Sequence, residues 1–388
     1  TIVAVGFLFA LLPLIGAFLT YYPEEPKAAF WRGLSYVNPY YVMGRLSQSM
    51  YPARSVVSTD WWMHCCVMLG LSALVLLLSV VLVRKAALRQ AMGQAGLWSG
   101  RPARGPEEDT ATGRVRRVVG PPVLWKECRT PLLGRRKARG IIGAILLAAV
   151  LATTYLLCYA EGGLDDPETH IAYIVVLFSV GLLFTTVLPA TSIASEKESQ
   201  TWPLLLTTSI RESEILAGKF GGVLRRCAPA WALLFLHVLG FAAMGTIHPA
   251  AVFQLGLVVA WTLVFLSCTG LYFSVRLKHT TTAVIANMGL AAMLWAVVPF
   301  IWAIISEIGH GHGGALRAYV DLNPVAHAIV IAIATTRRSG LDQYEWLQGQ
   351  MANVVSATGW ILLTGLIYGV VGLIFAIRAG SRMRRNPL

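Results

Sequence analysis

Charged residues are scarce in this sequence. Only 13% of its 388 residues are Asp, Glu, Lys or Arg, while 56% are hydrophobic and the mean hydropathy is +0.63. Because soluble globular proteins carry about 25% charged residues, the composition argues against an ordinary soluble domain. The apolar residues come in long continuous runs rather than in ten-residue segments of alternating polarity, so membrane helices are expected and a membrane barrel is not.

A phosphate-binding loop for nucleotides is also missing. The pattern G-x-x-x-x-G-K-[ST] occurs nowhere, and the nearest approach, LAGKFGG, places Phe220 where the hydroxyl residue after Lys219 should stand. We therefore expect a chain that is not an enzyme and has no cofactor of its own. Ionisable residues are nearly absent from the middle of the apolar runs, which disfavours a transporter driven by protons or sodium ions.

Cysteine is sparse and carries no pattern. None of the cysteines has a partner at the spacing of a metal site, so free thiols and no metal are predicted. The six are Cys65, Cys66, Cys128, Cys158, Cys227 and Cys268.

Several runs of about 20 apolar residues are long enough, at 1.5 Å per residue, to cross a hydrocarbon layer of about 30 Å. The sequence predicts eight spans of this kind and hence an all-α polytopic membrane protein. They lie at residues 1–20, 61–83, 141–160, 170–194, 223–245, 250–274, 281–304 and 356–377.

The basic residues are concentrated in particular loops. Between Arg84 and Arg139 fourteen Lys and Arg accompany four acidic residues, and the tail after residue 377 adds four arginines, whereas the loop at residues 161–169 is acidic. Basic loops alternate with neutral or acidic ones along the chain, as the positive-inside rule requires of cytoplasmic and external loops. The net charge of +13 is thus explained by topology, and nucleic acid is not expected as a partner.

Two regions of the chain read alike. Each has an apolar span, an external loop in which Asn and Pro open a short apolar segment (Asn38 and Pro39; Asn323 and Pro324), a second span and a basic end. Asn is a good helix N-cap and Pro suits the first helical turn, so both segments are predicted to be short interfacial or re-entrant helices. Four features in the same order favour a duplication.

The duplication divides the chain into three parts. Residues 121–388 form a complete unit of six spans, residues 1–83 correspond to the last two spans of a preceding unit, and residues 84–120 connect them. Four earlier spans of the first unit are then expected upstream of the first residue. The connector is rich in Gly, Pro and charge and has no apolar periodicity, which is typical of a cytoplasmic linker.

A charged segment interrupts the complete unit. Residues 195–222 join its second and third spans on the basic side and read SEKESQTWPLLLTTSIRESEILAGKFGG. Leu204, Leu205, Ile210 and Ile215 are spaced so that they could share one helical side, which favours short surface helices that offer charges and apolar side chains to a partner. A solvated loop that only reverses the chain is the alternative.

This segment resembles the second intracellular segment of permease subunits of ABC-2 type ATP-binding cassette (ABC) transporters. That signature has two acidic residues around a basic one, a Thr, a Leu-rich patch, then Glu-Ile and Gly-Lys. Gln200, Pro203 and Ser209 depart from the usual residues. The resemblance implies an ATPase-docking coupling helix made by Glu196, Lys197, Glu198, Thr201, Leu204, Leu205, Arg211, Glu214 and Lys219.

A second stretch resembles the same family. PPVLWKECRT, at residues 121–130, is similar to the amphipathic elbow helix that precedes the first span of such permeases. Apolar side chains of this helix are expected in the headgroup boundary of the membrane lipid, with its basic ones toward phosphate. The elbow residues are Val123, Leu124, Trp125, Lys126 and Glu127.

The resemblance implies the fold of an ABC-2 type (ABC exporter type V-like) transmembrane domain in a prokaryotic cytoplasmic (inner) membrane. It implies cytoplasmic ABC ATPase subunits as partners, with ATP and magnesium bound there, and it leaves room for further membrane or periplasmic subunits. Export is the expected direction because relatives mostly export. A membrane anchor or regulatory subunit of a larger complex is the alternative function.

Few polar residues lie deep in the predicted spans. His237 is the one histidine there, and Thr185, Thr186 and Asn287 are the other candidates for a substrate path. Polar side chains of this kind more often hold membrane helices together, so both interpretations stay open.

Overall fold

The computed structural model describes residues 62–80 except 71, 74, 75, 78 and 79, and then residues 120–129, 137–160, 162–308, 319–336, 344–345 and 351–383. Residues 62–80 belong to one compact unit, and the described residues from 120 onward belong to another. In the first unit, residues 62–70 and the other described positions up to 80 are helical, within the span predicted at 61–83. The span predicted at 1–20 and most of the linker lie outside the described residues.

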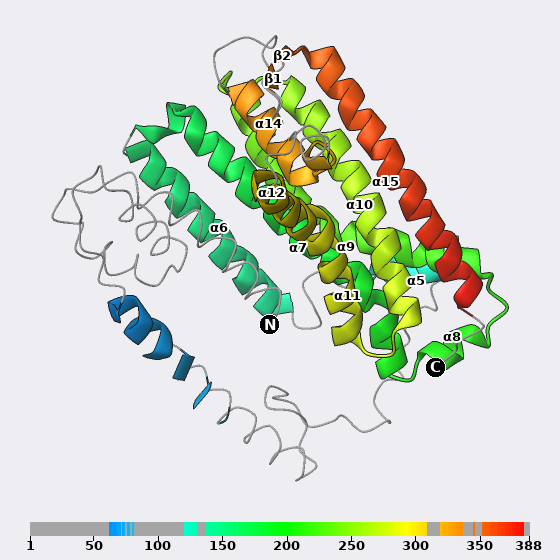
Figure 1. Cartoon of the computed structure of the whole chain (residues 1–388). Coiled ribbons are helices and arrows are strands. Elements are labelled where there is room, and N and C mark those ends of the chain that lie inside the picture. The colour runs from blue at the N-terminus through cyan, green and yellow to red at the C-terminus, as the bar shows by residue number, and fades with distance from the viewer. Residues whose placement is uncertain are drawn as a thin grey trace. The chain divides into compact units, whose positions relative to one another are not determined.

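The second unit is built almost entirely from helices (Figure 1). Its described helices are α5 (Pro122–Arg129), α6 (Lys137–Ala160), η1 (Gly163–Asp165), α7 (Pro167–Glu198), α8 (Trp202–Leu206), α9 (Glu212–Ala243), α10 (Ala250–Arg276), α11 (Thr280–Ala292), η2 (Met293–Val297), α12 (Val298–Ile308), α14 (Pro324–Thr336) and α15 (Val354–Arg382). Two short strands, β1 (Tyr344–Glu345) and β2 (Met351–Ala352), pair antiparallel.

Six stretches of the described chain are long and apolar enough to cross a membrane. They are Ile141–Ala160, Pro167–Glu198, Glu212–Ala243, Ala250–Arg276, Thr280–Ile305 and Val354–Arg382. These match the six spans predicted between residues 141 and 377, and they confirm an all-α, multi-pass membrane protein.

Two predicted boundaries, the end of the second span and the start of the third span of the complete unit, are wrong. The surface segment expected at residues 195–222 is much shorter, because α7 continues to Glu198 and α9 already begins at Glu212. Hydropathy ends a span at its first charges, but Glu, Lys, Ala and Leu are good helix formers, and the charges here are paired with other helices. Ile215 consequently lies buried in α9, and Leu204 lies exposed in α8, so the predicted common apolar side does not exist.

Helices α7 and α10 form the centre of the second unit. More than half of the residues in the apolar stretch of each of these two helices are buried, whereas α6, α15 and the α11–α12 stretch are mostly exposed. The exposed surfaces are apolar, with Leu362, Leu366 and Val370 along α15 as examples. Such surfaces suit contact with lipid, because a bilayer solvates apolar side chains and the helices satisfy their own backbone hydrogen bonds.

Glycines let the central helices approach closely. A Cβ at Gly181 of α7 would lie 2.6 Å from the ring of Trp231 of α9, and one at Gly270 of α10 would lie 2.8 Å from Pro189 of α7. Only a residue without a side chain fits at these crossings. Small residues at helix contacts are the usual means of packing membrane helices, since dispersion contacts rather than the hydrophobic effect hold them together there.

The fifth span contains a turn of π-helix, η2, between α11 and α12. A π-turn disturbs the i to i−4 hydrogen bonds of a helix. Tyr319 donates its hydroxyl to the carbonyl of Leu294 at 2.8 Å, and Asn323 donates its side-chain amide to the carbonyl of Trp295 at 2.8 Å. The residues just before α14 are therefore hydrogen-bonded to the irregular turn.

Helix α14 begins as predicted. Pro324 is its first residue, and the side-chain oxygen of Asn323 accepts the backbone N–H of Val325 at 2.9 Å, as an N-cap does. With 13 residues, α14 is about 20 Å long and too short to cross the hydrocarbon layer. It packs on α7 and α10 at the end of the unit opposite α5 and α8 (Figure 1).

Candidate functional site

The basic end of the second unit is the end at which α7, α10 and α15 finish and α9 and α11 begin. There the chain leaves α7 in a tight reversal. The N–H of Thr201 donates to the carbonyl of Glu196 at 2.9 Å, and that of Gln200 donates to the carbonyl of Lys197 at 3.0 Å. This is the Schellman pattern, which places a left-handed residue just after the helix. Gln200 has a φ of 58°, so a side chain occupies a conformation that favours glycine.

Helix α8 is anchored by one aromatic side chain. Trp202 is fully buried and packs in a cluster with Ile193, Ile215 and Val275 from α7, α9 and α10. Leu204, two residues later, points its side chain outward and is 69% exposed. The segment between the two spans is therefore anchored by the buried Trp202, while other side chains of the segment, such as Leu204, are exposed. We define the loop surface as six of its exposed residues: Thr201, Leu204, Thr207, Thr208, Ser209 and Arg211.

Three consecutive charges at the end of α7 each bind a different part of the chain. Glu196 accepts hydrogen bonds from Lys126 of α5 at 2.9 Å and forms an ion pair of 2.8 Å with Lys219 of α9. Lys197 donates to the carbonyl of Val275, in the last turn of α10. Cations are favourable there because the last carbonyls of a helix carry partial negative charge.

Glu198 binds the beginning of the next span. Its carboxylate oxygens accept the backbone N–H and the hydroxyl of Thr280, each at 2.7 Å. This carboxylate acts as a cap supplied from another helix, since the first N–H groups of α11 have no acceptor within their own helix. The Glu-Lys-Glu triplet thus connects the end of α7 to α5, α9, α10 and α11.

The predicted elbow helix, α5, lies against α9 and is not free at the surface. Its Val123 is 4% exposed and packs on Gly218, where a Cβ would lie only 2.8 Å from the valine Cβ. Gly221 and Gly222 make the same close approach to Leu124 and Glu127. The three glycines give α9 a flat side on which α5 can rest.

A buried carboxylate joins the two helices. Glu127 is 3% exposed and forms an ion pair of 2.6 Å with Lys219, which is itself 2% exposed. Arg226 forms a second ion pair with Glu127, and Arg225 donates to the Glu127 backbone carbonyl at 3.1 Å. Buried charges require partners of this kind, because their desolvation is costly. We call Lys126, Glu127, Glu196, Lys219 and Arg226 the ionic network.

The structure separates the predicted docking residues into two groups. Glu196, Lys197 and Lys219 make their contacts inside the chain, and Glu198 does so as well although it is exposed. Thr201, Leu204, Arg211 and Glu214 are exposed, while Leu205 of α8 is half-buried against the cluster that holds Trp202. Of the elbow residues, Leu124 and Trp125 are half-buried and the Arg129 guanidinium lies 4.2 Å from the Trp125 ring centroid.

The candidates for a substrate path lie between helices. Asn287 of α11 is fully buried, donates to the carbonyl of Thr186 of α7 at 2.7 Å and accepts the hydroxyl of Thr269 of α10 at 2.8 Å. Thr185 is buried too and accepts the indole N–H of Trp231 at 3.0 Å. These polar groups are hydrogen-bonded across helix contacts, and together they join α7, α9, α10 and α11.

His237 belongs to a cluster nearer the opposite end. Its Nδ1 lies 2.6 Å from the hydroxyl of Tyr155, and its ring is stacked on Tyr173 with 5.2 Å between centroids. His170 lies beside it, 5.6 Å away by ring centroids, and its Nε2 lies 2.9 Å from the carbonyl of Leu164. The cluster connects α6, α7 and α9. Among the residues that the structure describes, no group of three or more His, Cys, Asp or Glu is placed to hold a metal ion.

Sequence reasoning missed the glycine side of α9 and the partners of the charges. Gly218, Gly221 and Gly222 offered a weak signal, because small residues three and four positions apart share one side of a helix. Nothing local indicated that Glu127 would meet Lys219, ninety-two positions later.

Comparison with known proteins gives no further identification. No family model matches the sequence, and no curated protein matches it. The function has to be argued from the membrane helices, the loop surface and the ionic network.

Proposed function

We propose that this chain is the transmembrane permease of an ATP-binding cassette transporter of the ABC-2 type. ATP and magnesium are bound by a separate cytoplasmic subunit that docks on the loop surface. Residues 121–388 form one complete permease unit, residues 1–83 are the last two spans of a preceding unit, and residues 84–120 link them. The membrane is a prokaryotic inner membrane, and the direction is export.

The observation that carries the proposal is the combination of exposure and anchoring in residues 199–211. Leu204 offers an apolar side chain to a partner, while the neighbouring Trp202 is fully buried among three spans. A docking element needs both properties, because it must be reachable and must also pass a displacement to the spans. A solvated loop that only reverses the chain needs neither.

The contacts around the loop supply a route for that displacement. A push on α8 moves the end of α7, and the charges there are bonded to the end of α10 and the beginning of α11. Lys219 and Glu127 carry the same movement to α9 and α5. Rigid-body shifts of packed helices between two arrangements are a common way to alternate access across a membrane. In this chain Glu196, Lys197, Glu198 and Lys219 act as positioning residues for that motion.

The test is purification of the chain from its native membrane in mild detergent, followed by mass spectrometry of the proteins that accompany it. A stoichiometric subunit with a phosphate-binding loop supports the proposal. Companions that are all membrane subunits without such a loop would overturn it and favour a membrane anchor or regulatory subunit. ATP hydrolysis that rises with added substrate separates transport from anchoring.

A matched pair of variants sharpens this test. Leu204→Asp places a charge on the loop surface and should reduce the amount of accompanying ATPase. Thr281→Asp places the same charge at another exposed position of the basic end, in the first turn of α11, where an acidic residue is well tolerated. Equal recovery of the ATPase with both variants would show that the loop surface is not its docking site.

A further inference from the structure

Helix α6 is the least buried span of the second unit. Only 6% of its apolar stretch is buried, and Cys158 is the one buried side chain among the residues of α6 whose burial the structure describes. Nearby, Tyr155 stacks on Tyr173 of α7 with 4.5 Å between ring centroids, and its hydroxyl lies 2.6 Å from Nδ1 of His237 of α9. These side-chain contacts, which join α6 to α7 and α9, lie at the end of α6 that precedes the acidic loop.

Two buried histidines lie at this attachment. His170 of α7 is 1% exposed and His237 of α9 is 5% exposed, with 5.6 Å between their ring centroids. The ring of Phe241 lies against both, at 4.4 Å and 5.0 Å between centroids. The surroundings of the two imidazoles are therefore largely aromatic. We call Tyr155, His170, Tyr173, His237 and Phe241 the histidine cluster.

Each imidazole has one nitrogen in a hydrogen bond and one without. The Nε2 of His170 lies 2.9 Å from the carbonyl of Leu164. A carbonyl can only accept, so Nε2 carries the hydrogen and the Nδ1 of the neutral ring has none. This Nδ1 is buried and has no hydrogen-bond partner among the described residues. In His237 the Nδ1 faces the Tyr155 hydroxyl, and the Nε2 is the buried atom without a partner in the described part of the chain.

Protonation would disturb both rings in the same way. An imidazolium donates from both nitrogens, so each histidine would gain a charged N–H group that is buried without an acceptor. Burying such a group is costly. Two imidazolium rings with centroids 5.6 Å apart would in addition repel each other. The packed cluster therefore requires neutral imidazoles.

The charged groups around the cluster compensate little for a proton on it. The carboxylate of Asp165, on η1, acts on His170, but Asp165 is exposed, so water and ions screen its charge. Glu168, two residues before His170, is exposed as well. Helix α9 contributes the apolar Phe241. The remaining titratable groups are the hydroxyls and the thiol of Tyr155, Tyr173 and Cys158, which are ordinarily neutral near pH 7.

We propose that the histidine cluster is a pH-dependent contact, which releases this end of α6 from α7 and α9 on acidification. When α6 moves away, water reaches the imidazoles, and they titrate with the ordinary histidine pKa of about 6.5. Opening then takes up protons, so its equilibrium shifts toward the open form as the pH falls below about 6.5. Between pH 7 and pH 5 the equilibrium constant for opening should rise about 25-fold for each histidine that is protonated only in the open form.

The pH-dependent contact goes beyond the proposed function and does not depend on it. The alternation of basic and acidic loops places this end of α6 on the external side of the membrane. The pH there follows the surroundings of the cell, whereas the cytoplasm is buffered. A change in external pH would thus alter the packing of the first span of the unit.

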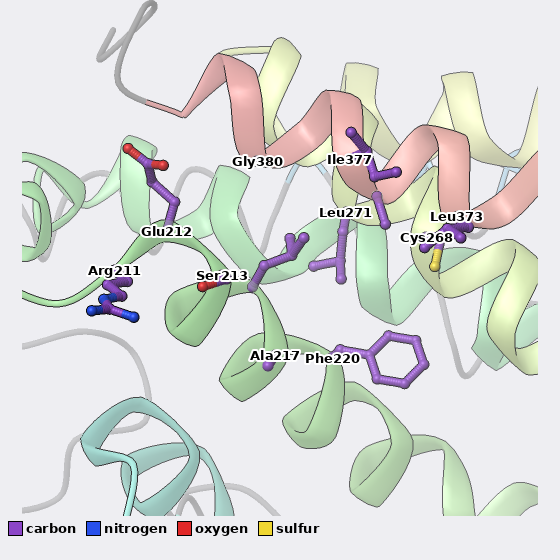
Figure 2. Close-up of a pocket in the computed structure, with 12 residues that line it drawn as sticks. Arg211, Glu212, Ser213, Ala217, Phe220, Cys268, Leu271, Leu373, Ile377 and Gly380 are labelled. Carbon is purple, nitrogen blue, oxygen red and sulfur yellow. The ribbon is translucent and has the colours of Figure 1, made fainter.

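The test measures how well the buried thiol of Cys158 is protected in the full chain in mixed micelles. N-ethylmaleimide modifies the chain for different times at pH 5, 6, 7 and 8, and mass spectrometry follows each cysteine. The rate in the denatured chain at the same pH, divided by the rate in the folded chain, is the protection factor. The fully buried Cys227 is the reference for the core, because Cys268 lines a cavity between α9, α10 and α15 (Figure 2).

We expect the protection factor of Cys158 to fall at least about 25-fold from pH 7 to pH 5, while that of Cys227 stays constant. A Cys158 protection factor that does not change with pH would overturn the proposal. A parallel loss of protection at Cys227 would overturn it too, because the whole unit would then be unfolding in acid.

Variants identify the groups that titrate. His170→Gln with His237→Asn keeps a side-chain amide near each bonded nitrogen but cannot be protonated, so the protection factor of Cys158 should no longer depend on pH. His170→Gln alone should retain about half of the change on a logarithmic scale, and it serves as the test if the double variant does not fold. His248→Gln, at an exposed histidine between α9 and α10, should behave like the parent chain. A pH dependence that survives removal of His170 and His237, or that disappears with His248→Gln, would contradict the proposal.

Discussion

The Nζ of Lys219 lies 2.6 Å from the Oε1 of Glu127, and both side chains are almost completely buried although α5 and α9 stand ninety-two positions apart at these residues. The same Nζ lies 2.8 Å from Glu196 at the end of α7. One ammonium group thus holds three helices together, α5, α7 and α9. The residues that a partner would contact, those of the loop surface, are therefore different from the residues that fix their position, those of the ionic network.

Removing this ammonium group should be costly. Lys219→Ala leaves two carboxylates with fewer partners in a site that excludes water, so we expect a loss of about 3–5 kcal/mol in the free energy of unfolding. Reversible unfolding in mixed micelles measures it. Lys278→Ala, at an exposed lysine of the same end, should change stability by less than about 0.5 kcal/mol. Equal losses for the two variants would show that the ionic network contributes nothing specific.

The contact between α5 and α9 can be tested with two glycines of one helix. A Cβ at Gly218 would lie 2.8 Å from Val123 and 2.9 Å from the Leu124 backbone nitrogen, whereas one at Gly240 would meet nothing within 4 Å. Gly218→Ala should therefore destabilise the chain by about 1–3 kcal/mol through overpacking. Gly240→Ala should stabilise it by about 0.5–1 kcal/mol because alanine is the better helix former. Thermal unfolding of both variants decides, and effects of the same sign would refute the packing described for α5.

The turn after α7 contains a residue that glycine would suit better. Gln200 has a φ of 58° in a Schellman turn, a conformation that costs a residue with a side chain about 1–2 kcal/mol. Gln200→Gly removes this strain but also increases the conformational entropy of the unfolded chain, which offsets part of the gain. The free energy of unfolding should therefore rise by up to about 1 kcal/mol. Gln200→Ala is the control, because it keeps the Cβ. If alanine stabilised as much as glycine, backbone conformation would not be the cause.

A substitution of Asn287 distinguishes a structural role of this residue from a place on a substrate path. It bonds to α7 and α10 at once, so Asn287→Leu should cost about 1–2 kcal/mol by the scale of hydrogen bonds between membrane helices. We expect the thermal midpoint to fall and, under the proposed transport function, the spectrum of transported compounds to stay the same. A changed spectrum at unchanged stability would place Asn287 on the path instead.

Asp321, in the turn before α14, should make stability depend on pH. Burial raises the pKa of its carboxyl above the usual range, and its Oδ1 is buried without a hydrogen-bond partner among the described residues. The folded chain therefore favours the neutral acid. The stabilising contribution is complete below the ordinary Asp pKa of about 3.9 and is lost as the pH rises through the raised value.

Asp321→Asn removes this titration. The variant should unfold at a higher temperature than the parent chain at pH 7, and the difference should disappear in acid. Melting curves across that range test the sign directly. A variant that is less stable than the parent at pH 7 would mean that the ionised carboxylate has a favourable partner.

The spans of the second unit could be predicted because their signal is local. Runs such as residues 250–274 are apolar along their whole length, and the length needed to cross a bilayer is fixed by helix geometry. The start of α14 was equally predictable, since Asn323 and Pro324 act within one helical turn. In each case the residues that decide the structure are neighbours in sequence.

The ends of α7 and α9 could not be predicted for the opposite reason. Charges at Glu196 and Lys219 lower the hydropathy of their segments, so a hydropathy boundary falls too early. They remain helical, with Lys219 buried and Glu196 half-buried, because each finds a partner from another helix. The same holds for Gly218, whose lack of a side chain has meaning only once Val123 lies against it.

The most direct test of the proposed function is a photoreactive amino acid introduced at position 204, in the full chain in its native membrane. After irradiation, the polypeptide attached to the chain is identified by mass spectrometry, with the same amino acid at position 236 as a control that faces lipid. We predict that position 204 captures a protein that carries a phosphate-binding loop and that position 236 does not. Capture at 204 of only a membrane subunit without that loop, or of no protein at all, would contradict the assignment of residues 199–211 as the docking site of an ATPase.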